Sequence, residues 1–350
     1  MKYGLMVVGT ETGINIGDYI QAIAAKQFLP QVDKYIERER LKEYSEDNIA
    51  MIMNGYYMHN GNQWPPSSSI IPLYVAFHIN DLVKDAFSSS ESINYLKQYE
   101  PIGCRDKTTE FFLREKGIKA YFSGCLTLTL GKTYKYKGER KGIYFVDPPI
   151  TFLNRKEKIK YLIKSIFKWT KIKNIYKKKH NRNINIKNWC ETSKFYFTYT
   201  QFFEENILLN ANYITQQSKL YKEKYNSNEE LLDIAEKLIN TYAKAELVIT
   251  SRIHCALPCL GLDTKVLYIY NDLQTKASSC RMDGLKQLFN IVHWDGYKLY
   301  SDIKPNNEKI KVTNCPPNKK DWEKYAKELS QRCDEFIHHN NSLLSTKNRK

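Results

Sequence analysis

Three side chains that suit the binding of an anion lie close together at 251–254. Ser251, Arg252 and His254 directly follow an apolar run, 247–250. A guanidinium forms paired hydrogen bonds with phosphate or carboxylate oxygens, and an imidazole exchanges a proton near neutral pH. Together they could hold an oxyanion and move a proton. The alternative is structural, with Arg252 paired to a local acid and His254 packed in the core.

The runs around these residues predict the element that positions them. Leu247–Thr250 and Val266–Tyr270 are short, continuous apolar runs, and a brief apolar segment that stops at Gly261 lies between them. This pattern is typical of a parallel strand–helix–strand unit with both faces of the sheet covered. Ligands of such sheets bind beyond the carboxyl ends of the strands, near helix N-termini. Ser251, Arg252 and His254 are expected at that edge.

A second polar segment follows the first predicted strand, Lys2–Gly9. The loop 10–18 contains Asn15, Gly17 and Asp18, and the helix Tyr19–Leu29 comes next. Asp18 could cap this helix or contact a ligand, and the residue types do not decide between the two. Further along, Arg105 follows the predicted strand Pro101–Cys104. It could contact a substrate or pair with a nearby carboxylate.

The length of 350 residues predicts two domains. Strands and helices alternate up to about residue 135, and the Lys- and Gly-rich segment 131–142 follows. A second set of predicted strands comes after it: Ile143–Val146, Phe195–Tyr199, Tyr213–Thr215, Leu247–Thr250 and Val266–Tyr270. A long final helix is expected over Trp322–His338. The fold class is therefore α/β with two doubly wound halves.

Positive charge is concentrated in one segment. The net charge is +16, and residues 154–187 hold 13 Lys or Arg against the single acid Glu157. The rest of the chain is nearly neutral, which argues against a nucleic-acid-coating protein. Apolar residues between Ile159 and Ile172 form a stripe opposite the lysines. The pattern fits a helix on an anionic membrane surface, or a solvated helix packed on its own domain.

The remaining features of the chain predict a soluble intracellular protein. No apolar run is long enough to span a bilayer, and the N-terminal sequence does not have the pattern of a signal peptide. The eight cysteines contain no CxxC pair. Cys255 and Cys259 lack the partners that a zinc site needs, so buried reduced thiols are expected and no metal site is.

Taken in order, these motifs resemble those of the polysaccharide pyruvyl transferase family. Asn15-Ile16-Gly17-Asp18 is similar to the family's N-terminal Asn-x-Gly-Asp loop. Gly103-Cys104-Arg105-Asp106 with Thr109 is similar to its Arg-Asp segment. Thr250-Ser251-Arg252-Ile253-His254 resembles its most diagnostic motif, Ser-Arg-hydrophobic-His.

The resemblance implies two Rossmann-like domains facing a cleft, as in glycosyltransferase-B folds, with a C-terminal helix that crosses back. Residues 1–140 would form the acceptor side. Residues 141–320, with the basic insertion 154–187, would form the donor side, and 321–350 the final helix and tail. The implied reaction moves the enolpyruvyl group of phosphoenolpyruvate to a sugar diol of a polysaccharide repeat unit and yields a pyruvate ketal and phosphate. It requires neither a metal nor a redox cofactor. A lipid-linked acceptor would place the protein in the cytoplasm or at the inner face of the cell membrane.

The chemistry of the implied reaction suggests roles for these residues. His254 would donate a proton, and Arg252, with Ser251, would hold the donor while Arg281 closes over it. Asp18 would act on the acceptor hydroxyl. The acceptor would be held by Asn15 and Gly17, and Arg105 would contact either substrate. Two other hypotheses remain at this point: a glycosyltransferase that uses a nucleotide sugar, and a basic membrane- or polymer-binding protein without catalysis.

Overall fold

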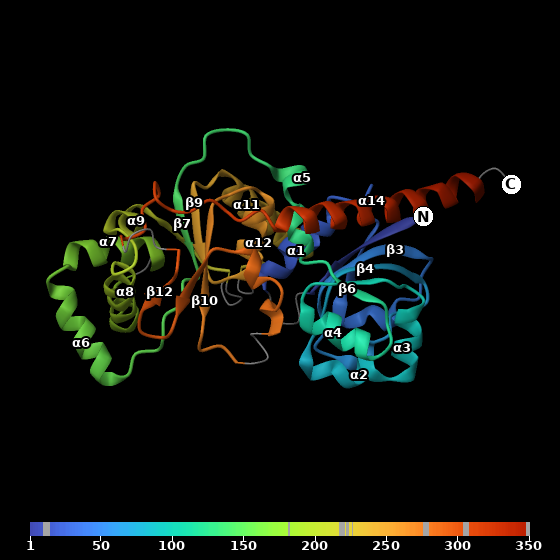
Figure 1. Ribbon diagram of the computed structural model, residues 1–350, viewed down its shortest axis with the longest axis horizontal. Helices are drawn as coiled ribbons and strands as arrows, with labels where there is room; N and C mark the ends of the chain where they lie inside the picture. Colours follow the sequence, from blue (N-terminus) through green and yellow to red (C-terminus); the bar gives the residue numbers. More distant parts are fainter. Residues whose placement is uncertain are drawn as a thin grey trace.

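A computed structural model describes residues 1–9, 15–180, 183–216, 221, 224–225, 227–275, 280–303 and 308–347. Within these residues, two largely parallel sheets lie in separate halves of the molecule and are flanked by helices (Figure 1). The expected α/β architecture with two Rossmann-like domains is therefore confirmed. Residues 10–14 and Ser279, which belong to the two loops predicted to contact ligand, lie outside the described residues.

The N-terminal sheet is parallel throughout. Its strands are β1 (Lys2–Val7), β2 (Lys34–Glu37), β3 (Ile49–Tyr57), β4 (Ile70–Ile79), β5 (Ile102–Cys104) and β6 (Ala120–Phe122). Its α-helices are α1 (Ile16–Lys26), α2 (Lys84–Ser88), α3 (Ser90–Lys97), α4 (Lys107–Glu115) and α5 (Gly131–Tyr134). The 3-10 helices are η1 (Arg38–Glu43), η2 (Gly61–Gln63), η3 (Asp81–Val83) and η4 (Leu126–Thr129).

The C-terminal sheet is parallel except for its last strand. Its strands are β7 (Ile143–Val146), β8 (Asn212–Ile214), β9 (Leu247–Thr250), β10 (Val266–Asn271), β11 (Ile291–Trp294) and β12 (Leu299–Tyr300). The α-helices are α6 (Arg155–Ile166), α7 (Trp169–His180), α8 (Ile186–Tyr199), α9 (Glu205–Asn210), α11 (Asn228–Lys244) and α12 (Ile253–Gly261). The 3-10 helices are η5 (Cys280–Met282) and η6 (Lys286–Leu288), and the final helix is α14 (Trp322–Lys347).

Both sheets have the same strand order. The orders are β2-β1-β3-β4-β5-β6 and β8-β7-β9-β10-β11-β12. In each sheet the second strand lies on one side of the first, and the third strand lies on its other side, so the direction of the strand order reverses. The reversal leaves a switch point between β1 and β3 and another between β7 and β9. Open α/β sheets bind ligands at such points, beyond the carboxyl ends of the strands. The predicted polar segments follow β1 and β9, so the topology places both at switch points.

One apolar core joins the two domains. Ile20 of α1 and Leu128 of η4 belong to the same buried cluster as Leu231 of α11 and Leu257 of α12. The backbones also approach closely here, because a Cβ atom at Gly261 would lie 2.4 Å from the carbonyl oxygen of Leu128. Only glycine fits at that contact. The relative position of the domains is therefore set by packing rather than by a linker.

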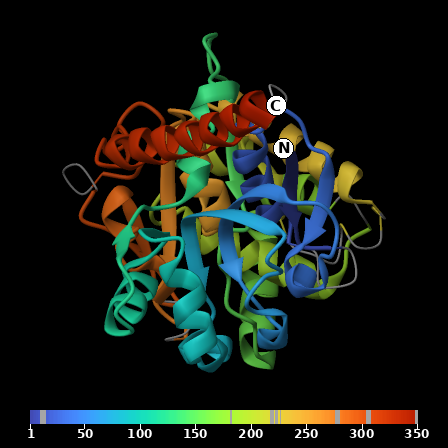
Figure 2. The same cartoon turned by 90° about the vertical axis from the view of Figure 1, so that its right-hand side faces the viewer.

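The final helix α14 crosses from the C-terminal domain over the N-terminal one (Figure 2). Along it, Tyr325 packs edge-on against Phe122 with ring centroids 5.1 Å apart. Near its end, the hydroxyl of Tyr3 donates to Asn341 Oδ1 at 2.6 Å. The expected return of the C-terminal helix is confirmed.

The basic segment 154–187 forms two helices rather than the single amphipathic helix implied by one continuous stripe. Helix α6 begins with a capping box between Asn154 and Glu157, and α7 follows after a turn. Ile172 and Ile175 of α7 are buried in the core of the C-terminal domain. The second helix is therefore a structural part of its domain and not an appendage to it.

The predicted strand Phe195–Tyr199 is wrong, because these residues form the last turns of α8. Phe195 and Tyr199 are buried one helical turn apart. A short aromatic run looks the same from sequence whether it is a buried strand or a buried helix end. None of the described helices has the length and apolar character needed to cross a membrane.

Candidate active site

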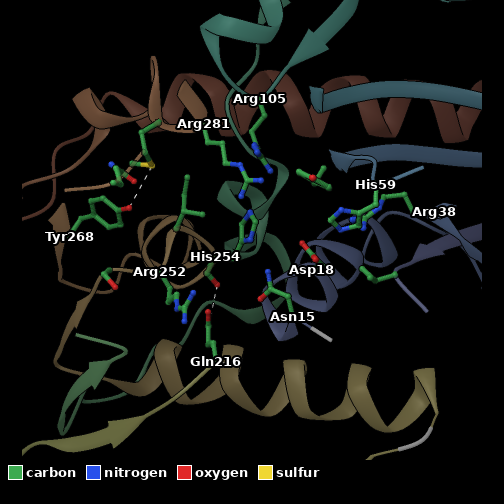
Figure 3. A pocket seen from close by; sticks show the side chains of 16 residues that line it. Asn15, Asp18, Arg38, His59, Arg105, Gln216, Arg252, His254, Tyr268 and Arg281 are labelled. Atoms are coloured by element: carbon green, nitrogen blue, oxygen red, sulfur yellow. Dashed lines mark hydrogen bonds between the residues drawn. The ribbon is translucent and has the colours of Figure 1, made fainter. Parts of the chain in front are cut away.

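A cavity of about 350 Å³ lies between the two domains and is lined by side chains from both. Asn15, Asp18 and Arg105 enter it from the N-terminal domain, and Arg252 and His254 from the C-terminal one. Figure 3 shows Arg105 and Arg281 pointing toward the imidazole of His254, with Asp18 beside it. Seven of the eight predicted site residues line this cavity: Asn15, Asp18, Arg105, Ser251, Arg252, His254 and Arg281.

Arg105 brings a buried positive charge to the cavity. It follows β5 and is only 3% exposed, yet its Nε has no hydrogen-bond partner among the described residues. The carboxylate of Asp106 lies 4.0 Å from this Nε, which is too far for a hydrogen bond. Burial lowers the pKa of Arg105. A buried guanidinium nitrogen without a hydrogen-bond partner needs an explanation, and an anionic ligand would supply one.

Two further arginines stand around the ring of Tyr56. The guanidinium carbons of Arg38 and Arg281 each lie 5.0 Å from the centroid of that ring. Such cation–π contacts hold both groups at the cavity wall. Arg38 is buried and also pairs with Glu39 through a 2.9 Å bond from its Nε. Tyr56 therefore holds two guanidinium groups at the wall of a cavity that Arg105 also lines.

His254 owes its position to a kink in α12. Pro258 has no N–H, so it cannot donate to the carbonyl four residues earlier, which is that of His254. His254 accordingly has non-helical angles (φ −84°, ψ 21°), and its carbonyl lies 3.5 Å from Nε2 of Gln216. The ring atom Nε2 is buried without a partner among the described residues. Burial, with the nearby Arg105 and Arg281, lowers the pKa of His254 well below its ordinary value and favours a neutral imidazole.

Gly17 does not line the cavity but supports His254 from behind. A Cβ atom at position 17 would lie 2.9 Å from the Cβ of His254 and 3.1 Å from its Nδ1. Both distances are shorter than ordinary contacts between such atoms. The start of α1 therefore touches the imidazole across the domain boundary, and glycine makes that approach possible.

Asp18 faces the cavity from the first turn of α1. It is not the cap of that helix, because Asn15 takes this role by accepting a hydrogen bond from the N–H of Gly17 at 3.1 Å. The Asp18 carboxylate accepts from Gln21 at 3.0 Å. Burial raises its pKa, and the nearby Arg38 and Arg105 offset part of the rise. A raised pKa suits a carboxylate that has to accept a proton near neutral pH.

Ser251 and Arg252 are anchored to Asp147, which follows β7 at the switch point. The Nε of Arg252 donates to the Asp147 carboxylate at 2.8 Å, and the hydroxyl of Ser251 donates to its carbonyl at 2.6 Å. The alternative that Arg252 pairs with a local acid is therefore correct for its Nε. The two terminal nitrogens form no bond to any described residue, and Arg252 still lines the cavity. Asp147 therefore orients the guanidinium and leaves its outer edge open.

A buried pair lies behind Arg105. His78 Nδ1 is 2.6 Å from an Asp106 oxygen, and the same carboxylate accepts from the N–H of Thr109 at 2.9 Å as the cap of α4. Burial lowers the pKa of His78 to about 4, and Arg105 adds to this effect. Burial alone would raise the pKa of Asp106, but His78 and Arg105 hold it below its usual value. The carboxylate that follows Arg105 in sequence is thus engaged elsewhere.

Several lining residues had no clear signal in the sequence. Arg38 belongs to the charged run 37–43, which is typical of a solvated surface, and Tyr56 lies near the end of the strand β3. Asp147 could have been found, since it follows a predicted parallel strand. Within the described part of the chain, no cluster of three His, Cys, Asp or Glu side chains could hold a metal ion.

The arrangement can bind a small, highly charged anion and exchange protons with it. Arg38, Arg105 and Arg281 supply fixed positive charge, His254 an imidazole and Asp18 a carboxylate of raised pKa. Because Arg38, Arg105 and His254 are buried, they interact with an anion more strongly than they would in bulk solvent.

Comparison with known proteins adds a family assignment. A family model described as polysaccharide pyruvyl transferase matches residues 15–272, well over half of the chain. A functionally uncharacterised protein of known crystal structure from Klebsiella pneumoniae subsp. pneumoniae NTUH-K2044 is 13% identical in sequence. The alignment covers 80% of this chain and 86% of that one, with a TM-score of 0.39. The search of curated proteins finds no significant match.

Proposed function

Because the chain belongs to the polysaccharide pyruvyl transferase family, we propose that it uses phosphoenolpyruvate as donor. It transfers the enolpyruvyl group to two hydroxyls of one sugar, forms a cyclic pyruvate ketal and releases phosphate. The matched range 15–272 contains the predicted site residues except Arg281. The family establishes the general kind of transferase, and the cavity supports the identity of the donor.

The observations that carry this proposal are the guanidinium groups around the cavity and the buried Nε of Arg105, which has no hydrogen-bond partner among the described residues. Phosphoenolpyruvate has about three negative charges on its phosphate and carboxylate at neutral pH. Arg38, Arg105 and Arg281 supply three guanidinium groups, and the buried Nε of Arg105 has no protein partner among the described residues. A bound trianion would satisfy that donor and would neutralise the field of the arginines.

The proton balance of the reaction fits His254 and Asp18. A proton is added to the methylene carbon, which becomes a methyl group and leaves a cationic carbon for the first sugar hydroxyl to attack. The bond to phosphate then breaks, and the second hydroxyl closes the ketal. The two hydroxyls release the proton taken up by the methylene and the one that leaves with phosphate. His254 would give the first proton, and Asp18 would accept one from a hydroxyl.

The binding of the donor would prepare His254 for this role. Burial and the charges of Arg105 and Arg281 lower the pKa of His254 and favour the neutral imidazole. A bound trianion opposes those charges and favours the protonated form, so the pKa of His254 would rise. The division into an acceptor side and a donor side stays a prediction, since arginines of both domains line the cavity.

A turnover assay tests the proposal. The purified chain is incubated with phosphoenolpyruvate and p-nitrophenyl galactosides, and both phosphate and product mass are followed. We expect phosphate release that depends on the acceptor, together with a product that has gained one pyruvate ketal. The His254→Ala variant is the matched control. Consumption of UDP-galactose in a parallel reaction, with phosphoenolpyruvate untouched, would instead establish a nucleotide-sugar glycosyltransferase.

We further propose that helix α6 docks the protein on the inner face of an anionic membrane, where a lipid-linked acceptor would be presented. Helix α6 lies at the far end of the C-terminal domain (Figure 1). Ile163 and Ile166 of this helix and Phe167, which follows it, are 55%, 67% and 82% exposed. Exposed lysines of α6, including Lys160 and Lys164, surround them. Each buried apolar side chain would contribute about 1.5–3 kcal/mol, and each lysine about 1 kcal/mol near anionic lipid.

Sedimentation with liposomes tests the docking. The chain should bind phosphatidylglycerol vesicles at low salt, be released at high salt, and bind phosphatidylcholine weakly. Ile166→Ser with Phe167→Ser should abolish binding. The matched control is Leu82→Ser with Tyr297→Ser, which removes two apolar side chains elsewhere that are at least as exposed on average, 88% and 80%. Equal losses in both double variants, or no binding by the native chain, would rule out α6 as the docking element.

A further inference from the structure

A second and larger cavity, of about 730 Å³, lies at the carboxyl edge of the C-terminal sheet. The residues at the ends of its parallel strands line it: Asp147 after β7, Thr215 after β8, Ser251 after β9, Asn271 at the end of β10 and Trp294 at the end of β11. Sheets of this topology bind ligands at that edge. Phosphoenolpyruvate is much smaller than this space, so a bulkier ligand is needed to fill it.

Lys179 of α7 lines this cavity without a partner. Its Nζ lies 4.4 Å from the ring centroid of Phe195 and 5.8 Å from that of Tyr213. It forms no hydrogen bond or ion pair with any described residue. Burial lowers the pKa of Lys179 to about 8. Glu191 and Asp147 oppose part of this lowering, but neither forms an ion pair with the ammonium. An ammonium held over aromatic rings without a direct ion pair is a position at which an anionic group of a ligand would be stabilised.

The other charges around Lys179 leave room for an anion. The carboxylate of Asp147 is already bonded to Arg252 and to the N–H of Gln216, so it does not neutralise the ammonium. The titratable or charged groups that share the cavity are Asp147, His180, Lys187, Glu191, Tyr213 and Arg252. Burial lowers the pKa of His180 to about 4, so it is neutral at pH 7. Three cations therefore face two carboxylates, of which one is engaged.

The walls of the cavity suit a saccharide. Trp294, Tyr213 and Phe152 offer aromatic surface, while Thr151, Thr215 and Asn271 offer polar groups. Apolar walls with a few placed polar groups are typical of small-molecule sites. The cavity shares Ser251 and Arg252 with the cavity that contains His254. A ligand could therefore occupy the larger cavity and extend one end to the reacting groups.

We propose that the larger cavity binds the acceptor saccharide and that Lys179 holds an anionic group of it, either a phosphate or a uronic acid carboxylate. The identification of this saccharide as the acceptor rests on the proposed function, whereas the prediction that the cavity binds a charged saccharide does not. The reacting hydroxyls would then enter the smaller cavity past Arg252. Lys179 would act in recognition of the acceptor and not in the chemistry.

Ligand-observed NMR titration without phosphoenolpyruvate tests this assignment. The probes are galactose 1-phosphate, galacturonate and neutral galactose, added to the full chain. The native chain should bind one or both charged sugars at least tenfold more tightly than galactose. Lys179→Met should remove that preference, since a charge-assisted hydrogen bond contributes about this factor. The matched control is Lys177→Met, an exposed lysine on the same helix, and it should bind like the native chain.

Two further arms separate the possible outcomes. In the Arg105→Met background, the preference for charged sugars should persist, which shows that they do not bind among the arginines of the smaller cavity. Affinity for charged sugars should fall above about pH 8 in the native chain and stay constant in Lys179→Arg, because arginine remains protonated. Equal binding of charged and neutral sugars, or an unchanged preference in Lys179→Met, would overturn the proposal. Failure of phosphoenolpyruvate to bind would overturn only the proposed function.

Discussion

Replacing Gly17 with alanine tests whether the contact between the domains positions His254. The new Cβ would lie 2.9 Å from the Cβ of His254, where carbon atoms normally stay about 3.5–4.0 Å apart. The overlap of roughly half an ångström to one ångström has to be relieved by moving the imidazole or the start of α1. A displacement of about 1 Å at a reacting group costs on the order of 10²-fold in rate. Overpacking costs about 1–3 kcal/mol, offset by about 1 kcal/mol because alanine favours the helix.

We therefore expect Gly17→Ala to lower kcat by about ten- to a hundredfold and to lower the unfolding free energy by no more than about 2 kcal/mol. Turnover and urea unfolding measure the two effects. Gly61→Ala is the matched control, because its Cβ would lie equally close, 2.9 Å, to the Cβ of Ala86 but away from the cavity. If both variants lose the same fraction of activity, or if Gly17→Ala keeps native kcat, the contact does not position His254.

Three other predictions concern neighbouring groups. His254→Ala should lower kcat by about 10² to 10⁴ with phosphoenolpyruvate binding retained in calorimetry, and native turnover would remove His254 from the chemistry. Arg252→Lys should raise KM for phosphoenolpyruvate at least about tenfold, because one ammonium cannot both hold Asp147 and form a fork on the donor; an unchanged KM would exclude Arg252 from the donor site. His78 should contribute up to about 1.4 kcal/mol per pH unit to the loss of stability between pH 6.5 and 4, since the unfolded chain protonates it and the native one, with a pKa of about 4, does not. Urea unfolding at pH 7 and 5 checks this share, because the slope should be smaller in His78→Asn than in the native chain, and an equal slope would contradict it.

The parts of the fold that follow from local patterns could be predicted from sequence. Leu247–Thr250 is a strand with the predicted bounds, and the polar residues after it lie at the cavity. This prediction succeeded because a parallel strand with both faces covered needs a continuous apolar run, and the topology brings the residues after such strands to one edge. The same logic placed Arg105 and Asp18. It did not place Phe195, because an aromatic run does not distinguish a strand from a buried helix end.

Other parts of the site depend on contacts between distant segments. Arg38 lies in a run of charged residues, and such a run predicts a solvated surface. The sequence therefore does not indicate that the Arg38 side chain packs against Tyr56. Gly17 looked like a ligand-binding residue, but its role is steric and becomes visible only when α1 and α12 meet. Lys179 was one lysine among 13 basic residues of its segment, and only the aromatic rings of α8 and β8 set it apart. Sequence patterns report what each segment requires, whereas these features arise from tertiary packing.

Calorimetric titration of phosphoenolpyruvate tests the central claim, that the cavity between the domains binds this donor. The native chain should bind one molecule, and Arg105→Met should weaken binding by about ten- to a hundredfold, because the charge-assisted hydrogen bond from the buried Nε is lost. Arg114→Met, which removes an exposed arginine of α4, should bind like the native chain. Binding that is equal in native chain and Arg105→Met, or no binding by the native chain, would contradict the account.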